Sequence, residues 1–260
     1  MDSILHDRIP YDTDARKLPG VLALDPACWL IRDERFDEQM ALRDDLIRQR
    51  KAEVVALQET GRVAAQELLS AVLAYLSPDK GYAIGPHFID RPDGISVALD
   101  MNDPLTTLGY LVQEDFCLLQ KPDSSPPGKD GEHVLTGAVL CFPAGWMLEQ
   151  KIGRPLVRIH RPVKAYDADI AKRVQRLFDG VRVGRPLWRH NALSYADPAL
   201  FQPHKEGEHK YGDKEKHAFV RSERQTITRL PKTGAVVFSI HTFVVRREAV
   251  RMGNNSPLLG

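Results

Sequence analysis

The stretch Phe219–Leu230 (FVRSERQTITRL), followed by Pro231-Lys232-Thr233-Gly234 and by Ala235–Val245 (AVVFSIHTFVV), decides the fold. Both long segments are rich in β-branched and aromatic residues, and the segment between them holds Pro and Gly. The pattern therefore predicts two strands joined by a tight hairpin turn. A third strand is predicted at Pro186–Ser194. Sequential strands without a helix between the last two favour an antiparallel sheet.

The first half of the chain is predicted to be largely helical. An extended arm runs to about Asp25, and apolar residues at helical spacing predict helices over about Asp37–Tyr75, with a possible break at Thr60-Gly61. Gly and Pro within Ile84–Asp100 indicate short strands or a hairpin. Another helix is expected from Asp103-Pro104 to about Gln113, because Asp is a good cap and Pro suits the first helical position.

The middle of the chain is expected to mix strands and short helices. Glu114–Gln120 fits a strand or a helix end equally well, whereas Val134–Phe142 is an apolar strand. Helices are predicted at Trp146–Ile152, Pro155–His160 and Asp167–Phe178. The fold class is therefore α+β: one domain over residues 1–260, in which an antiparallel sheet carries helices on one face and follows a helical extension of about residues 1–100.

Charge and cysteine content exclude several classes of protein. Lys plus Arg is 36 and Asp plus Glu is 35, so the net charge of +1 predicts no general attraction to nucleic acid or acidic membranes. The three cysteines, Cys28, Cys117 and Cys141, lie far apart and indicate a reduced, cytoplasmic protein without a disulfide framework. Buried inert thiols are the default interpretation of them, with a haem thiolate as the alternative. The sequence shows neither a signal peptide nor an apolar run long enough to span a membrane.

Common catalytic motifs are missing from the sequence. It contains no G-x-G-x-x-G after a strand, no P-loop, no G-x-S-x-G and no H-E-x-x-H. His204, His209 and His217 fall in one Lys- and Glu-rich stretch, for which a solvated loop is a better interpretation than a weak metal site.

Two places in the middle of the chain allow a structural or a functional interpretation. Glu114 and Asp115 form either a cap or surface pair at a helix end, or a buried acid that anchors a cation. His160 closes a short apolar segment, so it is either a core or capping residue or an axial haem ligand.

The predicted strands carry an unusual number of polar side chains. Alternation places Arg221, Glu223 and Gln225 on one face of their strand and Ser222, Arg224 and Thr226 on the other. Arg189 and Asn191 on one neighbouring strand, and His241 on the other, raise the same question. Such a face is either solvated or buried, and in the second case its polar groups need partners.

Several phrases occur together in this chain, in the order expected for one family. They are LRDDL (42–46), VQEDFC (112–117), FPAGW (142–146), KIGRPL (151–156), IHRPV (159–163), ERQT (223–226) and RLP (229–231). As a set they resemble the family of the haem-dependent oxidative N-demethylase alpha subunit, over about Leu18–Val245. The resemblance implies a haem-binding PAS-like domain with added N-terminal helices, and haem b as the cofactor. It also implies oxygen-dependent demethylation of a small secondary amine such as dimethylamine, with electrons from a separate NADPH-dependent flavin and iron–sulfur reductase.

The resemblance also implies roles for individual residues. His160 matches the family's Ile-His-x-Pro-Val pattern and is expected to be the proximal ligand of the haem iron. Arg189, Asn191, Glu223 and Arg224 match family positions. An Arg such as Arg189 suits a haem propionate, and Asn191 or Arg224 suits bound oxygen as a donor. Glu223 or Glu114 suits a cationic ammonium substrate. His241 stands where many relatives have Arg, and it is either a retuned residue of the cofactor pocket or a surface substitution.

Two other functions fit the same residues. A haem-binding PAS-like gas or redox sensor would use the same pocket without turnover. A pocket that has lost haem would bind another small apolar or cationic ligand. Formaldehyde release from an amine separates the demethylase from the sensor, whereas a His-ligated haem is common to both.

Overall fold

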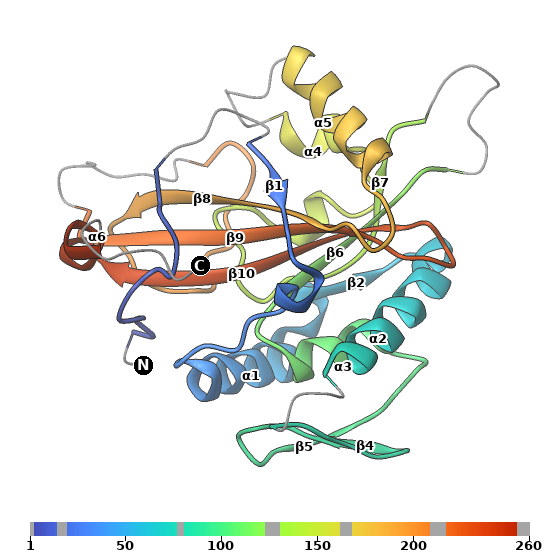
Figure 1. Cartoon of the computed structure of the whole chain (residues 1–260), viewed down its shortest axis with the longest axis horizontal. Helices are drawn as coiled ribbons and strands as arrows, with labels where there is room; N and C mark the ends of the chain where they lie inside the picture. Colours follow the sequence, from blue (N-terminus) through green and yellow to red (C-terminus); the bar gives the residue numbers. More distant parts are fainter. Residues whose placement is uncertain are drawn as a thin grey trace.

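The computed structural model describes residues 3–14, 20–76, 81–122, 131–161, 168–208 and 217–253. Its centre is a seven-stranded antiparallel sheet in the order β1-β8-β9-β10-β6-β7-β2 (Figure 1). The strands are β1 (Leu22–Ala23), β2 (Val55–Leu57), β6 (Asp115–Gln120), β7 (Val134–Val139), β8 (Leu187–Tyr195), β9 (Phe219–Arg229) and β10 (Val236–Arg246). The predicted hairpin is β9–β10, which pairs along its whole length from Arg229↔Val236 to Phe219↔Arg246.

Helices cover both faces of the sheet, so the expectation of helices on one face is wrong. Helices α1 (Phe36–Val54), α2 (Arg62–Leu76) and α3 (Pro104–Leu111) pack on one face, and α4 (Leu156–His160) and α5 (Ala168–Gly180) pack on the other (Figure 1). The reason lies in strands that are apolar on both sides. In β6, for example, Phe116 and Leu118 join the core under α1–α3, whereas Cys117 and Leu119 join the core under α4 and α5.

The undecided segments now have assignments. Glu114–Gln120 contributes strand β6, because it pairs with β10 on one side and β7 on the other. The predicted break near Thr60-Gly61 is a 3-10 turn, and strand β2 precedes it. The segment Ile84–Asp100 belongs to a small sheet of β3 (Ala83–Ile84), β4 (Phe88–Asp90) and β5 (Ser96–Ala98). The predicted helix Trp146–Ile152 is wrong: Met147 is extended (φ −114°, ψ 135°), and only Leu148–Gln150 forms a 3-10 turn.

The N-terminal arm is partly built into the fold. Residues 3–14 pass beside β10, where His6 N donates to Val244 O at 2.7 Å, and Tyr11 hydroxyl bonds Ser222 on β9 at 2.9 Å. The His6 side chain is buried. A short helix, α6 (Arg247–Gly253), follows β10. None of the helices in the described ranges has the length and apolar character needed to cross a membrane.

Candidate functional site

The register of β8, β9 and β10 divides the predicted site residues between the two faces of the sheet. Asn191 lies opposite Glu223, and Arg189 lies opposite Gln225, which in turn pairs with Ile240 of the α4/α5 core. These polar residues therefore face α4 and α5. Arg224 pairs with His241, and both point to the α1 side. Since the sheet lies between the two groups, one pocket does not hold both.

A polar cluster on the α4/α5 face is centred on Glu223. Its Oε2 accepts hydrogen bonds from Asn191 Nδ2 at 3.0 Å and from Gln225 Nε2 at 2.9 Å. The other end of Gln225, Oε1, accepts a bond from Arg189 Nη1 at 2.6 Å. Arg221 Nε lies 3.9 Å from Glu223 Oε1. The amides of Asn191 and Gln225 thus fix the Glu223 carboxylate, and Gln225 links it to the Arg189 guanidinium.

Donors in this cluster are left without a partner inside the protein. Arg189 Nε and Thr242 Oγ1 are buried and make no hydrogen bond within the described structure. Thr242 lies opposite Glu223 in the β9–β10 register and is only 1% exposed. Burial lowers the pKa of Arg189, although Glu223 opposes the shift. A buried group without a partner costs about 1–3 kcal/mol, so such groups indicate a ligand or water that completes them.

His160 is the last residue of α4 and has the form of a metal ligand. Its Nδ1 lies 2.9 Å from Leu156 O, and because a carbonyl only accepts, this nitrogen carries the proton and Nε2 does not. Burial lowers the pKa of His160, and the cations Lys151 and Arg189 add to the shift, so the ring is neutral at pH 7. A neutral imidazole whose second nitrogen donates to a backbone carbonyl is the arrangement seen in metal-bound histidines.

His241 occupies a different environment, on the α1 face. Its Nε2 lies 2.8 Å from Asp33 Oδ2 and its Nδ1 lies 3.1 Å from Glu114 Oε1, so both nitrogens donate and the ring is an imidazolium. Burial opposes this charge, but the bonds to Asp33 and Glu114 prevail and raise the pKa of His241 to about 9. His6 Nε2 also bonds Asp33 Oδ2, at 2.9 Å, and ties the N-terminal arm to the same carboxylate.

The remaining α1-face residues hold parts of the fold together. Arg224 donates through Nη1 to Trp29 O at 3.1 Å and through Nη2 to Cys28 O, which pins that loop to β9. Glu114 and Asp115 are each 1% exposed, so the interpretation of a surface pair is wrong. Asp115 Oδ1 accepts a bond from Arg43 Nη1 at 2.7 Å and lies in the core.

The cysteines and the other histidines differ partly from expectation. Burial raises the pKa of Cys117 and of Cys141 to about 12, which keeps both thiols protonated, whereas Cys28 is exposed rather than buried. His217 is buried and not part of a solvated loop, and His209 lies outside the described residues. Within the parts of the chain that the structure describes, no three His, Cys, Asp or Glu side chains gather as a metal site would require.

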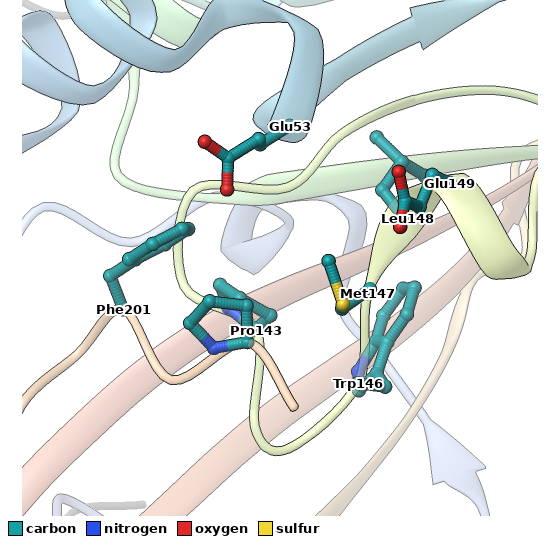
Figure 2. Close-up of a pocket in the computed structure, with 8 residues that line it drawn as sticks. Glu53, Pro143, Trp146, Met147, Leu148, Glu149 and Phe201 are labelled. Carbon is teal, nitrogen blue, oxygen red and sulfur yellow. The ribbon is translucent and has the colours of Figure 1, made fainter. Parts of the chain in front are cut away.

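A pocket lies beside the C-terminal end of α1 and the loop that contains Trp146 (Figure 2). Its lining includes Glu53, Pro143, Trp146, Met147 and Phe201, and none of the predicted site residues. The sequence interpretation also missed Thr242, Asp33 and Arg43. Strand alternation with Ile240 places Thr242 beside Glu223, so that signal was present in the sequence.

Comparison with known proteins adds one finding. A family model described as haem-dependent oxidative N-demethylase, alpha subunit-like, matches residues 20–257 of the chain.

Proposed function

The chain belongs to the family of haem-dependent oxidative N-demethylase, alpha subunit-like proteins, and from this premise we propose that it demethylates a small secondary amine such as dimethylamine. Amine, dioxygen, two electrons and two protons would give the demethylated amine, formaldehyde and water. The family name points to haem and to further subunits. We propose haem b as the cofactor, and a separate NADPH-dependent flavin and iron–sulfur reductase as the source of electrons.

The topology supports a PAS-like core. Strands β6, β7, β8, β9 and β10 form a continuous antiparallel sheet in the order β8-β9-β10-β6-β7, and α4 and α5 connect β7 to β8 across one face. A haem-binding PAS-like domain holds its cofactor between such helices and the sheet. His160 on α4 and the polar cluster on β8–β10 lie on this same side.

The residues on this face fit a haem group. The observation that carries the proposal is the combination of a neutral His160, with its Nδ1 proton bound to Leu156 O, and a buried Arg189 Nε without a partner. His160 Nε2 would bind the iron, and the Arg189 guanidinium would pair with a propionate. The apolar side chains of Ile159 and Leu187, which pack on the α4/α5 core, would contact the ring.

Haem bound there would supply the oxygen-dependent oxidation of an N-methyl group. The chain's own residues would bind and orient the substrate. Glu223, held by the Asn191 and Gln225 amides, would accept a hydrogen bond from the ammonium group of the amine. Asn191 would position that carboxylate, and Thr242 Oγ1 would offer a hydrogen-bond donor to dioxygen. Arg224, His241 and Glu114 lie on the other face, and we propose that they support the fold there.

The test is formaldehyde formation from dimethylamine, with oxygen and a chemical reductant, by haem-loaded protein. Wild type should release formaldehyde, and Glu223→Gln should raise the KM for the amine about tenfold or more, because it removes the charge that pairs with the ammonium group. Glu38→Gln, an exposed carboxylate paired with Arg35 at 3.3 Å, is the matched control and should behave as wild type. Haem-loaded wild type that releases no more formaldehyde than free haem would contradict the demethylase and favour the sensor.

A further inference from the structure

The charge of this chain is unevenly distributed. Residues 151–185 contain ten Lys and Arg but only three Asp and no Glu, although the whole chain carries a net charge of only +1. The rest of the chain is therefore acidic overall. This basic segment is the one that forms α4, α5 and the turn into β8.

Six of these cations are exposed and lie on or next to α4 and α5. Helix α5 turns Val174, Leu177 and Phe178 toward the sheet, which leaves its basic residues outside. The basic face, as we define it, consists of six exposed residues: Arg154 and Arg161 flanking α4, Lys172 and Arg176 on α5, and Arg182 and Arg185 in the turn that follows. The backbone carbonyl of His133 accepts from Leu156 N of α4, and its Nδ1 accepts from Gln175 Nε2 of α5.

The carboxylates near the basic face form their ion pairs with other cations, although Glu206 also interacts electrostatically with Arg161. The acids nearby have other partners: Asp169 pairs with Arg173 at 2.6 Å, Asp179 with Lys121 at 2.7 Å and Glu206 with Arg158 at 3.1 Å. Among the described residues, no carboxylate forms an ion pair with any of the six. A surface patch of one sign attracts partners of the other sign and speeds their association.

The patch also exposes apolar side chains. Val157 on α4 is 43% exposed and Val183, between Arg182 and Arg185, is 50% exposed. Apolar side chains within a charged rim are typical of surfaces that bind proteins. Surfaces that bind nucleic acid are more polar throughout.

We propose that the basic face is the docking surface for the acidic face of an electron-donor protein. The inference rests on the proposed function, because the donor would serve a haem bound to His160, and His160 lies on α4 between Arg154 and Arg161. A donor docked here lies over the helix that carries the ligand, and electron transfer falls steeply with distance. In each transfer the donor's reduced flavin or iron–sulfur centre loses one electron and the haem iron gains it, so two transfers serve one demethylation.

The first experiment measures attraction without haem. A fluorescent acidic peptide of alternating Glu and Leu is titrated with wild type, with the variant K172E/R176E/R182E, and with R8E/R48E/K232E, which changes three exposed cations away from the basic face. The basic-face variant should bind about tenfold or more weakly at low salt, and the control should bind as wild type. An equal loss of peptide affinity in both variants would overturn the proposal. The affinity of K172Q/R176Q/R182Q for the peptide should lie between those of wild type and K172E/R176E/R182E. This neutral variant replaces the charge-reversed one if the latter does not fold.

The second experiment measures access to the haem. Ferrous protein is oxidised by ferricyanide, an anion, and by hexaammineruthenium(III), a cation. For wild type the ferricyanide rate should fall as salt rises, and K172E/R176E/R182E should lose about tenfold or more of that rate at low salt while R8E/R48E/K232E keeps it. Unchanged ferricyanide rates in the basic-face variant would overturn the proposal. Tighter binding of duplex DNA, or of phosphatidylcholine–phosphatidylserine vesicles, than of the acidic peptide would also overturn it. If the purified protein binds no haem, the proposed function is wrong. The peptide titration does not need haem, so it still shows whether the basic face binds an acidic partner.

Discussion

The two faces of strands β8–β10 carry buried polar residues of similar type, but the hydrogen-bond partners of these residues differ between the faces. On the α1 face, the His241 imidazolium lies between two carboxylates and Arg224 donates to two backbone carbonyls. On the α4/α5 face, Arg189 Nε and Thr242 Oγ1 have no partner in the described structure. The α1 side has exceptions in Glu114 Oε2 and Thr226 Oγ1, yet the His241 imidazolium has two carboxylate partners there.

The contrast separates polar residues that support the fold from polar residues that await a ligand. A buried group paired within the chain adds to stability and specificity, whereas an unpaired one lowers stability until something binds it. Residue type alone does not separate the two classes, because Arg224 and Arg189 both lie on neighbouring strands of one sheet.

Removing Arg43 should destabilise the α1 side most strongly. Its guanidinium, fully buried, donates to Asp115 Oδ1 and to the carbonyls of Gly109, Gln113 and Glu114. Arg43→Met leaves a buried carboxylate without its cation, and should lower the free energy of unfolding by about 3–5 kcal/mol in urea denaturation. Arg48→Met, which breaks an exposed pair with Asp45 on the same helix, is the control and should change little. Similar effects of both changes would contradict the structural role of the α1 face.

His241 should make stability fall with rising pH. Its pKa is raised from 6.5 to about 9 in the folded protein, so the folded state holds a proton that the unfolded state releases between these values. The contribution of His241 is complete below pH 6.5 and is lost as pH passes about 9, on the order of 3 kcal/mol. His241→Gln should be less stable than wild type at pH 6, with a difference that shrinks toward pH 9.5. A difference that stays constant over this range would show that His241 is not the buried cation.

Removing one hydroxyl from each face should change the free energy of unfolding by small but different amounts. Ser239 Oγ on β10 accepts a bond from Trp29 Nε1 at 3.2 Å, whereas Thr242 Oγ1, three residues further along, has no partner. Ser239→Ala should lower the free energy of unfolding by about 1–2 kcal/mol, because it leaves the indole N–H unpaired. Thr242→Val removes an unpaired group, and the haem-free protein should keep or slightly gain stability. Equal losses, measured by thermal unfolding, would remove the distinction between the faces.

Local patterns in the sequence predicted much of the fold. The Pro231–Gly234 turn and the β-branched flanks predicted the β9–β10 hairpin, and alternation correctly separated Glu223 from Arg224. Helix α4 was predicted from Pro155 and the apolar spacing before His160. These features depend on neighbours within a few residues, which the sequence shows directly.

Features that depend on distant contacts were not predictable. The His241 imidazolium needs Asp33, 208 residues away, and Glu114, 127 residues away, and no local pattern links the three. The prediction of helices on one face only was wrong for a related reason. Strand β6 is apolar on both sides, and its six residues are too few to distinguish a strand from a helix end. The segment Trp146–Ile152 looked helical, but Met147 is extended and only Leu148–Gln150 forms a 3-10 turn.

We propose that the α4/α5 face binds haem through His160, and the visible absorption spectrum of the purified protein shows whether it does. Wild type, His160→Ala and His133→Gln are purified after expression with a haem precursor, recorded before and after dithionite, and assayed for haem by pyridine extraction. His133 is the control because it is also buried on this side, with a pKa lowered to about 4 chiefly by burial. Wild type and His133→Gln should show a Soret band that shifts on reduction, with about one haem per chain, and His160→Ala should lose or alter that band. Identical spectra for wild type and His160→Ala, or the absence of haem from all three proteins, would contradict the account.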